Sequence, residues 1–171
     1  EYKEMARLVA MKRREREEEL RRIIADLERR LKEAEVSADV IGRPKHLYSI
    51  YTKMVRQGKT FEQVLDVQAI RIVTPTVAGC YNALGVVHQV WRPIPGRFKD
   101  YIAGPKVNLY QSIHTSVMMD DGRPLEFQIR TDEMDRTARE GIAAHWKYKD
   151  EIDRPIPGRF KDYIAGPKVN L

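Results

Sequence analysis

The segment Leu125-Glu-Phe-Gln-Ile-Arg130 constrains the fold most, because apolar and polar residues alternate along it without a break. Side chains of a β-strand alternate between two faces, so the three apolar residues share one face and Glu126, Gln128 and Arg130 share the other. The chain must therefore build a sheet with an apolar core on one side. Charged groups are costly to bury without partners, so the polar face must line water or a ligand. An ion pair between Glu126 and Arg130 is the structural alternative.

Hydrophobic periodicity, proline and glycine predict the other elements of the chain. The expected helices are 3–35, as one long amphipathic helix or a helix pair, Lys45–Val55, Val77–Trp91 and Asp132–Lys149. The expected strands are Val36–Ile41, Ala69–Val73, Ser112–Met119 and Pro124–Thr131, with the turn Asp120–Gly122 joining the last two. This order predicts an α/β or α+β fold, in which helices flank a mixed sheet and an amphipathic helical segment comes first.

Charge and cysteine content narrow the classes of partner and compartment. The net charge of +6 and the pI near 9.4 favour an anionic partner, which could be a nucleotide, a nucleic acid or a membrane surface. Cys80 is the only cysteine, which excludes a disulfide framework and fits a reducing compartment. The sequence holds no apolar run of about 18 residues and no signal-peptide pattern, so we expect a soluble, cytoplasmic protein.

The loop 94–115 groups cations with an aromatic residue and a histidine, between glycines and prolines. Its candidate binding residues are Arg97, Lys99, Lys106, Tyr110 and His114. Cations at short spacings can converge on polyphosphate oxygens, and a tyrosine ring offers a face on which a base can stack. We interpret the loop as a phosphate and nucleobase site. A solvated basic loop is the alternative.

A second group of cations lies around the expected helix 45–55. Pro44 suits the first turn of a helix, and Arg43 and Lys45 flank that start, while Lys53 follows two turns later. A helix start presents unpaired N–H groups and the positive end of the helix dipole. These residues therefore predict a phosphate-binding helix start.

Two carboxylates stand out near the predicted strands, Asp66 just before one strand and Glu126 inside another. Mg²⁺ takes one or two carboxylates together with substrate phosphates, so two acids beside many cations suit magnesium-dependent phosphoryl chemistry. The four histidines are scattered, without the paired spacing of zinc ligands. The sequence also lacks a glycine-rich loop that ends in Gly-Lys-Ser/Thr, so a P-loop enzyme is not expected.

The segment Arg92–Leu109 recurs without a change as Arg154–Leu171. An architectural repeat normally recurs as a whole supersecondary unit, and natural repeats diverge. We therefore interpret 154–171 as an artificial duplication and derive the fold from residues 1–153.

Six ordered motifs over about residues 36–149 resemble the synthetase domain of the RelA/SpoT family. They are Gly42-Arg-Pro-Lys-His-Leu-Tyr-Ser-Ile-Tyr-Thr-Lys-Met54, Asp66-Val-Gln-Ala-Ile-Arg71, Pro95-Gly-Arg-Phe-Lys-Asp-Tyr-Ile-Ala103, Asn108-Leu-Tyr-Gln-Ser-Ile-His-Thr115, Glu126-Phe-Gln-Ile-Arg-Thr131 and Ala143-Ala-His-Trp146. The resemblance implies a nucleotidyltransferase-like mixed sheet. It also implies a GTP diphosphokinase that uses Mg²⁺ to transfer the β,γ-pyrophosphate of ATP to the 3′-hydroxyl of GDP or GTP. The product would be (p)ppGpp, the alarmone of the bacterial stringent response.

The resemblance also implies roles for individual residues. The ATP-binding set would be Arg43 and Arg71 around the adenine, with Lys45, Lys53, Arg97 and Lys99 on the phosphates. The acceptor-nucleotide set would be Tyr110, stacked on guanine, with Lys106, Asn108, Gln111 and His114. Asp66 would bind Mg²⁺, and Glu126 would either complete the metal site or take the proton of the 3′-hydroxyl.

The resemblance further implies a helical linker, 1–35, and a synthetase domain, 36–153, which the duplicate, 154–171, follows. Arg-Phe-Lys-Asp at 97–100 resembles the form in bifunctional members, yet the chain lacks the His-Asp dipeptide of their hydrolase domain. We therefore expect a fragment that synthesises but does not hydrolyse the alarmone. Ribosome contact would need parts of a full-length protein that are absent here, and no membrane or DNA partner is expected.

Two other functions stay open from the residues alone. One is a different Mg²⁺-dependent nucleotidyltransferase. The other is a non-catalytic module that binds a nucleotide or RNA, which would explain the charge but not Asp66 and Glu126.

Overall fold

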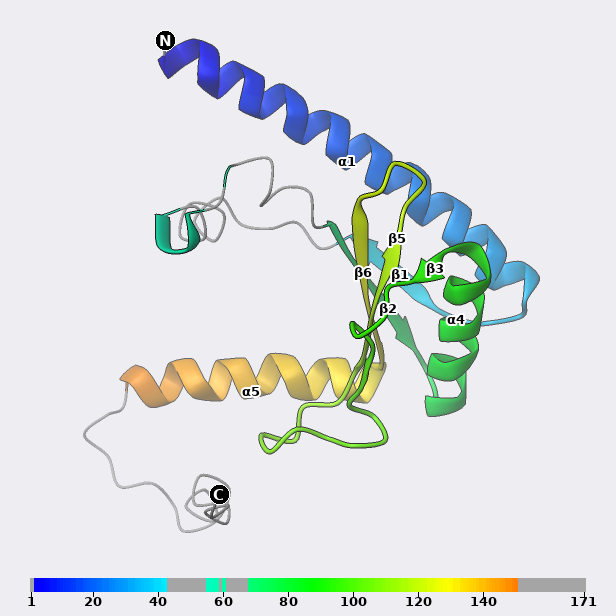
Figure 1. Ribbon diagram of the computed structural model, residues 1–171. Coiled ribbons are helices and arrows are strands. Elements are labelled where there is room, and N and C mark those ends of the chain that lie inside the picture. The colour runs from blue at the N-terminus through cyan, green and yellow to red at the C-terminus, as the bar shows by residue number, and fades with distance from the viewer. Residues whose placement is uncertain (1, 43–54, 59, 61–67, 151–171) are drawn as a thin grey trace.

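The computed structural model describes residues 2–42, 55–58, 60 and 68–150 (Figure 1). Their elements, in chain order, are α1 (Tyr2–Glu33), β1 (Asp39–Gly42), β2 (Gln68–Thr74), α4 (Val77–Val90), β3 (Arg92–Pro93), β4 (Lys99–Asp100), β5 (Ile113–Met118), β6 (Pro124–Thr131) and α5 (Asp132–Asp150).

The strands form one mixed sheet in the order β1-β2-β6-β5-β3, with β4 also paired to β5. Only the β2–β6 pair is parallel among the described strands, and it joins the two longest strands at the centre of the sheet. The β5–β6 hairpin is antiparallel, with Ile113 opposite Ile129. The predicted mixed sheet flanked by helices is confirmed.

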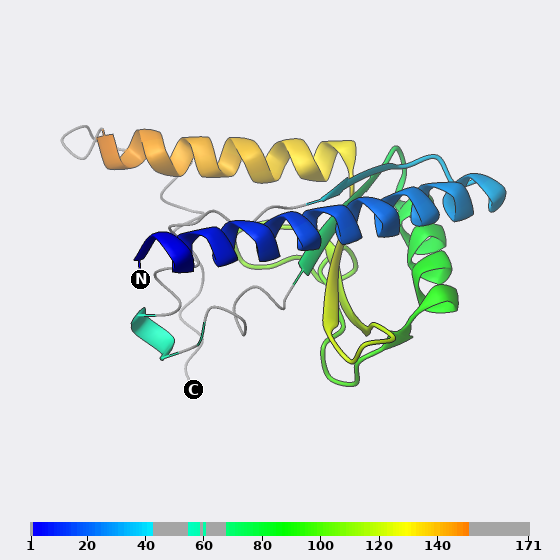
Figure 2. The ribbon, with the colours of Figure 1, turned by 90° about the horizontal axis from the view of Figure 1, so that it is seen from above.

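The apolar core lies on one face of this sheet, beneath α4 and the C-terminal half of α1 (Figures 1 and 2). The three apolar residues of β6 are completely buried there, as their alternation predicted, and Leu27 of α1 and Val87 of α4 are buried with them. Burial of a leucine or valine side chain contributes about 1.5–3 kcal/mol, so this face holds the helices on the sheet.

Helix α4 begins where Thr76 caps it, since the Gly79 N–H donates to Thr76 Oγ1 over 3.0 Å. Its buried residues recur at helical spacing, and Cys80 lies among them at 0% exposure. The Cys80 thiol contacts Thr74 Oγ1 of β2 at 3.1 Å. Burial raises the pKa of the thiol, which the contact with Thr74 partly offsets, so Cys80 acts as a core residue.

The long N-terminal pattern forms a single helix, α1, rather than a helix pair. Its C-terminal half packs on β1, where the missing side chain of Gly42 lets Leu20 approach: a Cβ there would lie 2.9 Å from Leu20 Cδ2. An ion pair at 2.6 Å between Glu19 and Arg123 ties the helix to the β5–β6 turn. The N-terminal half extends beyond the sheet (Figure 1).

Most predicted elements lie within two or three residues of the observed ones. The short strands β3 and β4 were not expected: β4 falls inside the expected loop 94–115, and β3 falls between that loop and the expected helix Val77–Trp91. Most of the predicted helix 45–55 and all of the duplicate 154–171 lie outside the described residues. Among the helices of the described part, none is long and apolar enough to cross a membrane.

Candidate functional site

A row of polar residues crosses the face of the sheet opposite the core. Arg71 on β2 pairs in register with Gln128 on β6, Gln128 with His114 on β5, and His114 with Lys99 on β4. Residues paired in register on neighbouring strands point to the same face. Four strands therefore align two cations, an amide and an imidazole in one line, on the face that the alternation of β6 predicted to be polar.

Glu126 lies on the same face of β6, two residues before Gln128, and pairs with Ala69 of β2 and Ser116 of β5. Its half-buried carboxylate accepts a hydrogen bond from Gln128 Nε2 at 3.3 Å. Asp66, its predicted partner, lies outside the described residues, as do Arg43, Lys45 and Lys53. In the ranges that the structure does describe, no group of three metal-ligating side chains occurs.

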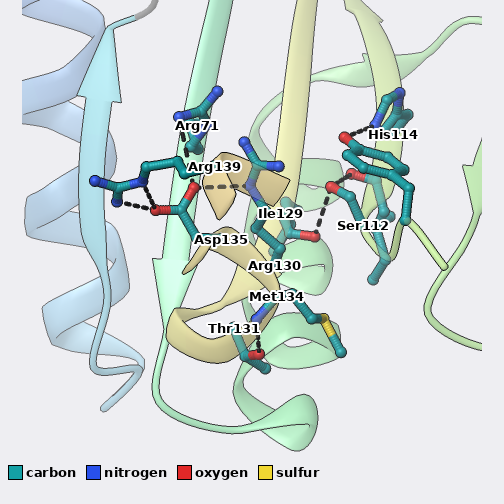
Figure 3. Close-up of polar contacts among 11 residues, drawn as sticks. Arg71, Ser112, His114, Ile129, Arg130, Thr131, Met134, Asp135 and Arg139 are labelled. Carbon is teal, nitrogen blue, oxygen red and sulfur yellow. Dashed lines mark hydrogen bonds and ion pairs between the residues drawn. The ribbon is translucent and has the colours of Figure 1, made fainter. Parts of the chain in front are cut away.

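Arg130 pairs with a residue that the sequence analysis did not consider, Asp135 in the first turn of α5. Asp135 is 2% exposed, and its Oδ1 lies 3.1 Å from Arg130 Nε and 3.5 Å from Arg71 Nη1 (Figure 3). Its other oxygen, Oδ2, accepts from Arg139 Nε at 2.9 Å. The Glu126–Arg130 pair considered as an alternative is thus replaced by this group, which we call the Asp135 cluster: Arg71, Arg130, Asp135 and Arg139.

The Asp135 cluster joins three elements. Arg71 comes from β2, Arg130 from β6 and Arg139 from α5 itself, four residues after Asp135. Removing one member of a buried ion pair typically costs about 3–5 kcal/mol, because the other charge stays buried without compensation. The cluster therefore fixes the start of α5 on the polar face, and Figures 1 and 2 show α5 projecting from this side, away from α4.

A ring cluster, made of Tyr101, Tyr110 and His114, lies beside the same face. Tyr110 Oη and His114 Nε2 lie 2.8 Å apart, and all three ring pairs meet edge to face, with centroids 5.5–6.3 Å apart. Lys106 Nζ lies 4.6 Å from the Tyr101 ring centroid and 5.4 Å from that of Tyr110. Arg130 Cζ lies 5.9 Å from the Tyr110 centroid, so a member of the Asp135 cluster also contacts the ring cluster.

Backbone contacts hold the loop that carries these rings. Asp100 Oδ1 accepts from the N–H groups of Ile102 and Ala103, and its Oδ2 accepts from Tyr81 Oη at 2.7 Å. Burial raises the pKa of this carboxyl, but the hydrogen bonds from Ala103, Tyr81 and Ile102 outweigh it, and the net pKa is lowered. Asp100 stays ionised at neutral pH and orders the loop.

The side chains of Asn108 and Gln111 hydrogen-bond to the backbone of this loop. Asn108 Oδ1 accepts from the Tyr110 N–H at 3.1 Å, and Gln111 Nε2 donates to the Ile102 carbonyl at 3.3 Å. Leu109 between them has a φ of 66°, which few non-glycine residues adopt. Arg97 is exposed in the turn before β4, where its N–H donates to the Ile94 carbonyl at 3.3 Å.

The structure therefore brings six predicted residues to one face or its edge: Arg71, Lys99, Lys106, Tyr110, His114 and Glu126. Sequence reasoning missed Tyr101 and Asp135. A signal for Asp135 existed, because two arginines on the polar faces of β2 and β6 need a counter-charge, and α5 follows β6 directly with three acids in its first turn.

Comparisons with known proteins agree on one family. The family profile described as "Region found in RelA / SpoT proteins" matches residues 42–153. A protein named GTP pyrophosphokinase from Streptomyces coelicolor is 51% identical over 167 residues, which cover 98% of this chain and 19% of that protein. The bifunctional (p)ppGpp synthase/hydrolase RelA of Mycobacterium tuberculosis is 47% identical over 153 residues, 90% of this chain and 21% of that one. The chain thus spans about a fifth of the length of these relatives.

Solved structures share the fold. Small alarmone synthetase 1 of Bacillus subtilis, bound to its product pppGpp, matches with a TM-score of 0.62 and 21% identity, over 85% of this chain and 81% of that one. A GTP pyrophosphokinase family protein from Streptococcus pneumoniae matches with a TM-score of 0.63 and 23% identity, over 86% and 79% of the two chains. At these identities the likeness supports the fold.

Proposed function

This chain belongs to the RelA/SpoT family, and from that premise we propose that its polar face transfers the β,γ-pyrophosphoryl group of ATP to the 3′-hydroxyl of GDP or GTP. One observation carries the proposal: the register row from Arg71 to Lys99 ends beside the ring cluster, on one face of one sheet. Cations can hold polyphosphates, and a tyrosine ring can stack on a base. One face thus offers the two kinds of contact that a pair of nucleotides needs.

The donor subsite, in this proposal, extends along the row from Arg71 on β2 to Lys99 on β4. Arg71 would contact the adenine, since its side chain keeps 24% exposure despite the ion pair with Asp135. Lys99 and Arg97 are exposed cations near β4 that would hold phosphates. Arg43, Lys45 and Lys53 would complete this subsite, as the family resemblance implies.

The acceptor subsite would lie at the ring cluster. Tyr110 would stack on the guanine, while Lys106 and His114, which contact that ring, would reach the sugar and phosphates. Asn108 and Gln111 would act mainly by shaping the loop, because both side chains hydrogen-bond to its backbone.

The carboxylate ligands proposed here, Glu126 and Asp66, suit a magnesium ion. Mg²⁺ prefers carboxylate oxygens and needs only one or two of them beside substrate phosphates and water. Glu126 is half-buried on the polar face, and Asp66 precedes β2, the strand paired with β6. These two residues would hold the ion, which would neutralise charge on the transferred phosphates.

In the transfer itself, the 3′-oxygen of the acceptor would form a bond to the β-phosphorus of ATP. The bond between that phosphorus and the oxygen bridging to the α-phosphate would break, and AMP would leave. The hydroxyl proton would pass to Glu126 or to water. The residues of the face contribute by positioning and by offsetting negative charge, which is the main route to catalysis in phosphoryl transfer.

The test is incubation of the full chain with ATP, GDP and Mg²⁺, followed by chromatography. AMP together with a guanosine tetraphosphate would support the proposal, and 3′-deoxy-GDP should give no such product. Release of pyrophosphate would instead indicate nucleotidyl transfer, and nucleotide binding without turnover would indicate a binding module. We place this activity in the cytoplasm, where both nucleotides are available.

A further inference from the structure

We infer that Asp135 is a positioning residue that couples the two nucleotide subsites, because one buried carboxylate holds an arginine from each of the paired central strands, β2 and β6. The inference rests on the proposed function, which assigns Arg71 to the donor subsite and Tyr110 to the acceptor subsite. Asp135 would touch neither nucleotide and would act through Arg71 and Arg130.

The two oxygens of Asp135 have separate partners. Arg139 of the same helix binds Oδ2, and its side chain is 72% exposed, so this bond lies toward solvent. The buried Oδ1 faces the sheet, where it lies 3.1 Å from Arg130 Nε and 3.5 Å from Arg71 Nη1. Arg139 thus orients the carboxylate so that one oxygen serves both strand arginines (Figure 3).

On the donor side, this contact limits where the Arg71 guanidinium can lie. Arg71 has one contact to Asp135, and its buried Nε atom has no hydrogen-bond partner in the described part of the chain. A guanidinium on a flexible side chain can contact a base well only if its plane is held in advance. Loss of the Asp135 charge would release it.

On the acceptor side, the same carboxylate acts through Arg130. This guanidinium is 4% exposed and lies 5.9 Å from the centroid of the Tyr110 ring, which in turn contacts His114. A shift of Arg130 would therefore move or loosen the ring on which guanine is proposed to stack. Asp135 thus contacts Arg71 of the proposed donor subsite and reaches the proposed acceptor subsite through Arg130.

The test compares Asp135→Asn with Asp132→Asn in the full chain. Both changes remove one negative charge from the first turn of α5, but Asp132 is exposed while Asp135 is 2% exposed. Titration calorimetry would give Kd values for GDP and, separately, for a non-hydrolysable ATP analogue. Energetic coupling between sites typically changes affinity by about 5-fold to 150-fold, so we expect Asp135→Asn to raise both Kd values by at least about tenfold. Asp132→Asn should change neither by more than about twofold.

The binding stoichiometry measured in these titrations distinguishes a positioning role of Asp135 from a loss of folded protein. A purely structural role would lower the fraction of molecules that bind, and the melting temperature, without changing Kd for the folded fraction. If Asp135→Asn does not fold, Asp135→Glu keeps the charge, displaces the carboxylate by one methylene, and should still weaken both nucleotides together. Unchanged affinity for either nucleotide in the folded variant, or an equal effect of Asp132→Asn, would overturn the inference. A wild-type chain that transfers no pyrophosphoryl group would overturn the proposed function instead, because these titrations do not depend on turnover.

Discussion

Replacement of the Tyr110 ring should weaken the acceptor nucleotide and spare the donor. In the ring cluster, Tyr110 contacts His114 through its hydroxyl at 2.8 Å and Lys106 through its ring at 5.4 Å. Tyr110→Ala removes both contacts and the surface on which guanine is proposed to stack. Tyr110→Phe removes only the hydroxyl, so it is the matched control.

The magnitude follows from these contacts. Stacking of a base on an aromatic side chain is worth about 1–3 kcal/mol, which corresponds to a rise in the GDP Kd of about 5-fold to 150-fold for Tyr110→Ala. Loss of the bond between Tyr110 Oη and His114 Nε2 should cost about 0.5–1.5 kcal/mol of stability in Tyr110→Phe. The ring of the Phe variant stays, so its GDP affinity should fall much less.

Titration calorimetry with GDP and with a non-hydrolysable ATP analogue checks both variants. The reasoning predicts a selective loss for GDP in Tyr110→Ala. Equal losses for the two nucleotides would refute a guanine platform, and so would a Phe variant as impaired as the Ala variant, because the hydroxyl rather than the ring would then matter.

Three further predictions concern the carboxylates, a histidine and the duplicated tail. Glu126→Gln and Asp66→Asn should each lower turnover at least about 100-fold with an unchanged melting temperature, since they remove charge and little volume; near wild-type turnover would make that carboxylate structural. Burial lowers the pKa of His88 from 6.5, so the unfolded state binds its proton first and stability should fall as pH drops below 6.5. His88→Gln should flatten that part of the stability curve in chemical denaturation at several pH values, although it also alters the 2.8 Å bond to Thr115. Truncation after Asp153 should leave turnover unchanged, and a clear rise would reveal an inhibitory tail.

Hydrophobic periodicity and turn residues predicted the helices and strands that depend on neighbouring residues in the sequence. The β5–β6 hairpin follows from alternation on both strands and from the Asp120–Gly122 turn, and α4 follows from its hydrophobic periodicity. The strand β4 could not be predicted in this way, because its two residues are strand only through pairing with β5, as between Lys99 and His114. The parallel pairing of β2 with β6 is equally a property of the assembled sheet.

In the candidate site, too, the sequence predicted single residues but not the contacts between distant strands. Residue types and motifs identified Arg71, Tyr110 and Glu126, because the chemistry of cations, rings and carboxylates is visible in the sequence. The acids at the start of α5 were visible in the sequence, but that Arg71 and Arg130 share one of them as a counter-ion depends on the pairing of β2 with β6, which makes the two arginines neighbours.

Asp135 was hard to recognise because its local setting already explains an acid there. The first turn of α5 holds Asp132, Glu133 and Asp135, and acidic residues in a first turn are stabilised by the helix dipole whether or not they have another role. Only the helical phase separates them: Asp132 and Glu133 are exposed, while Asp135 turns onto the sheet at 2% exposure. A buried carboxylate needs cations, and Arg71 of β2 and Arg130 of β6 supply them. An arginine on the polar face of a strand is therefore best interpreted together with the acids of the helix that follows, since the same charge can serve the fold and the ligand.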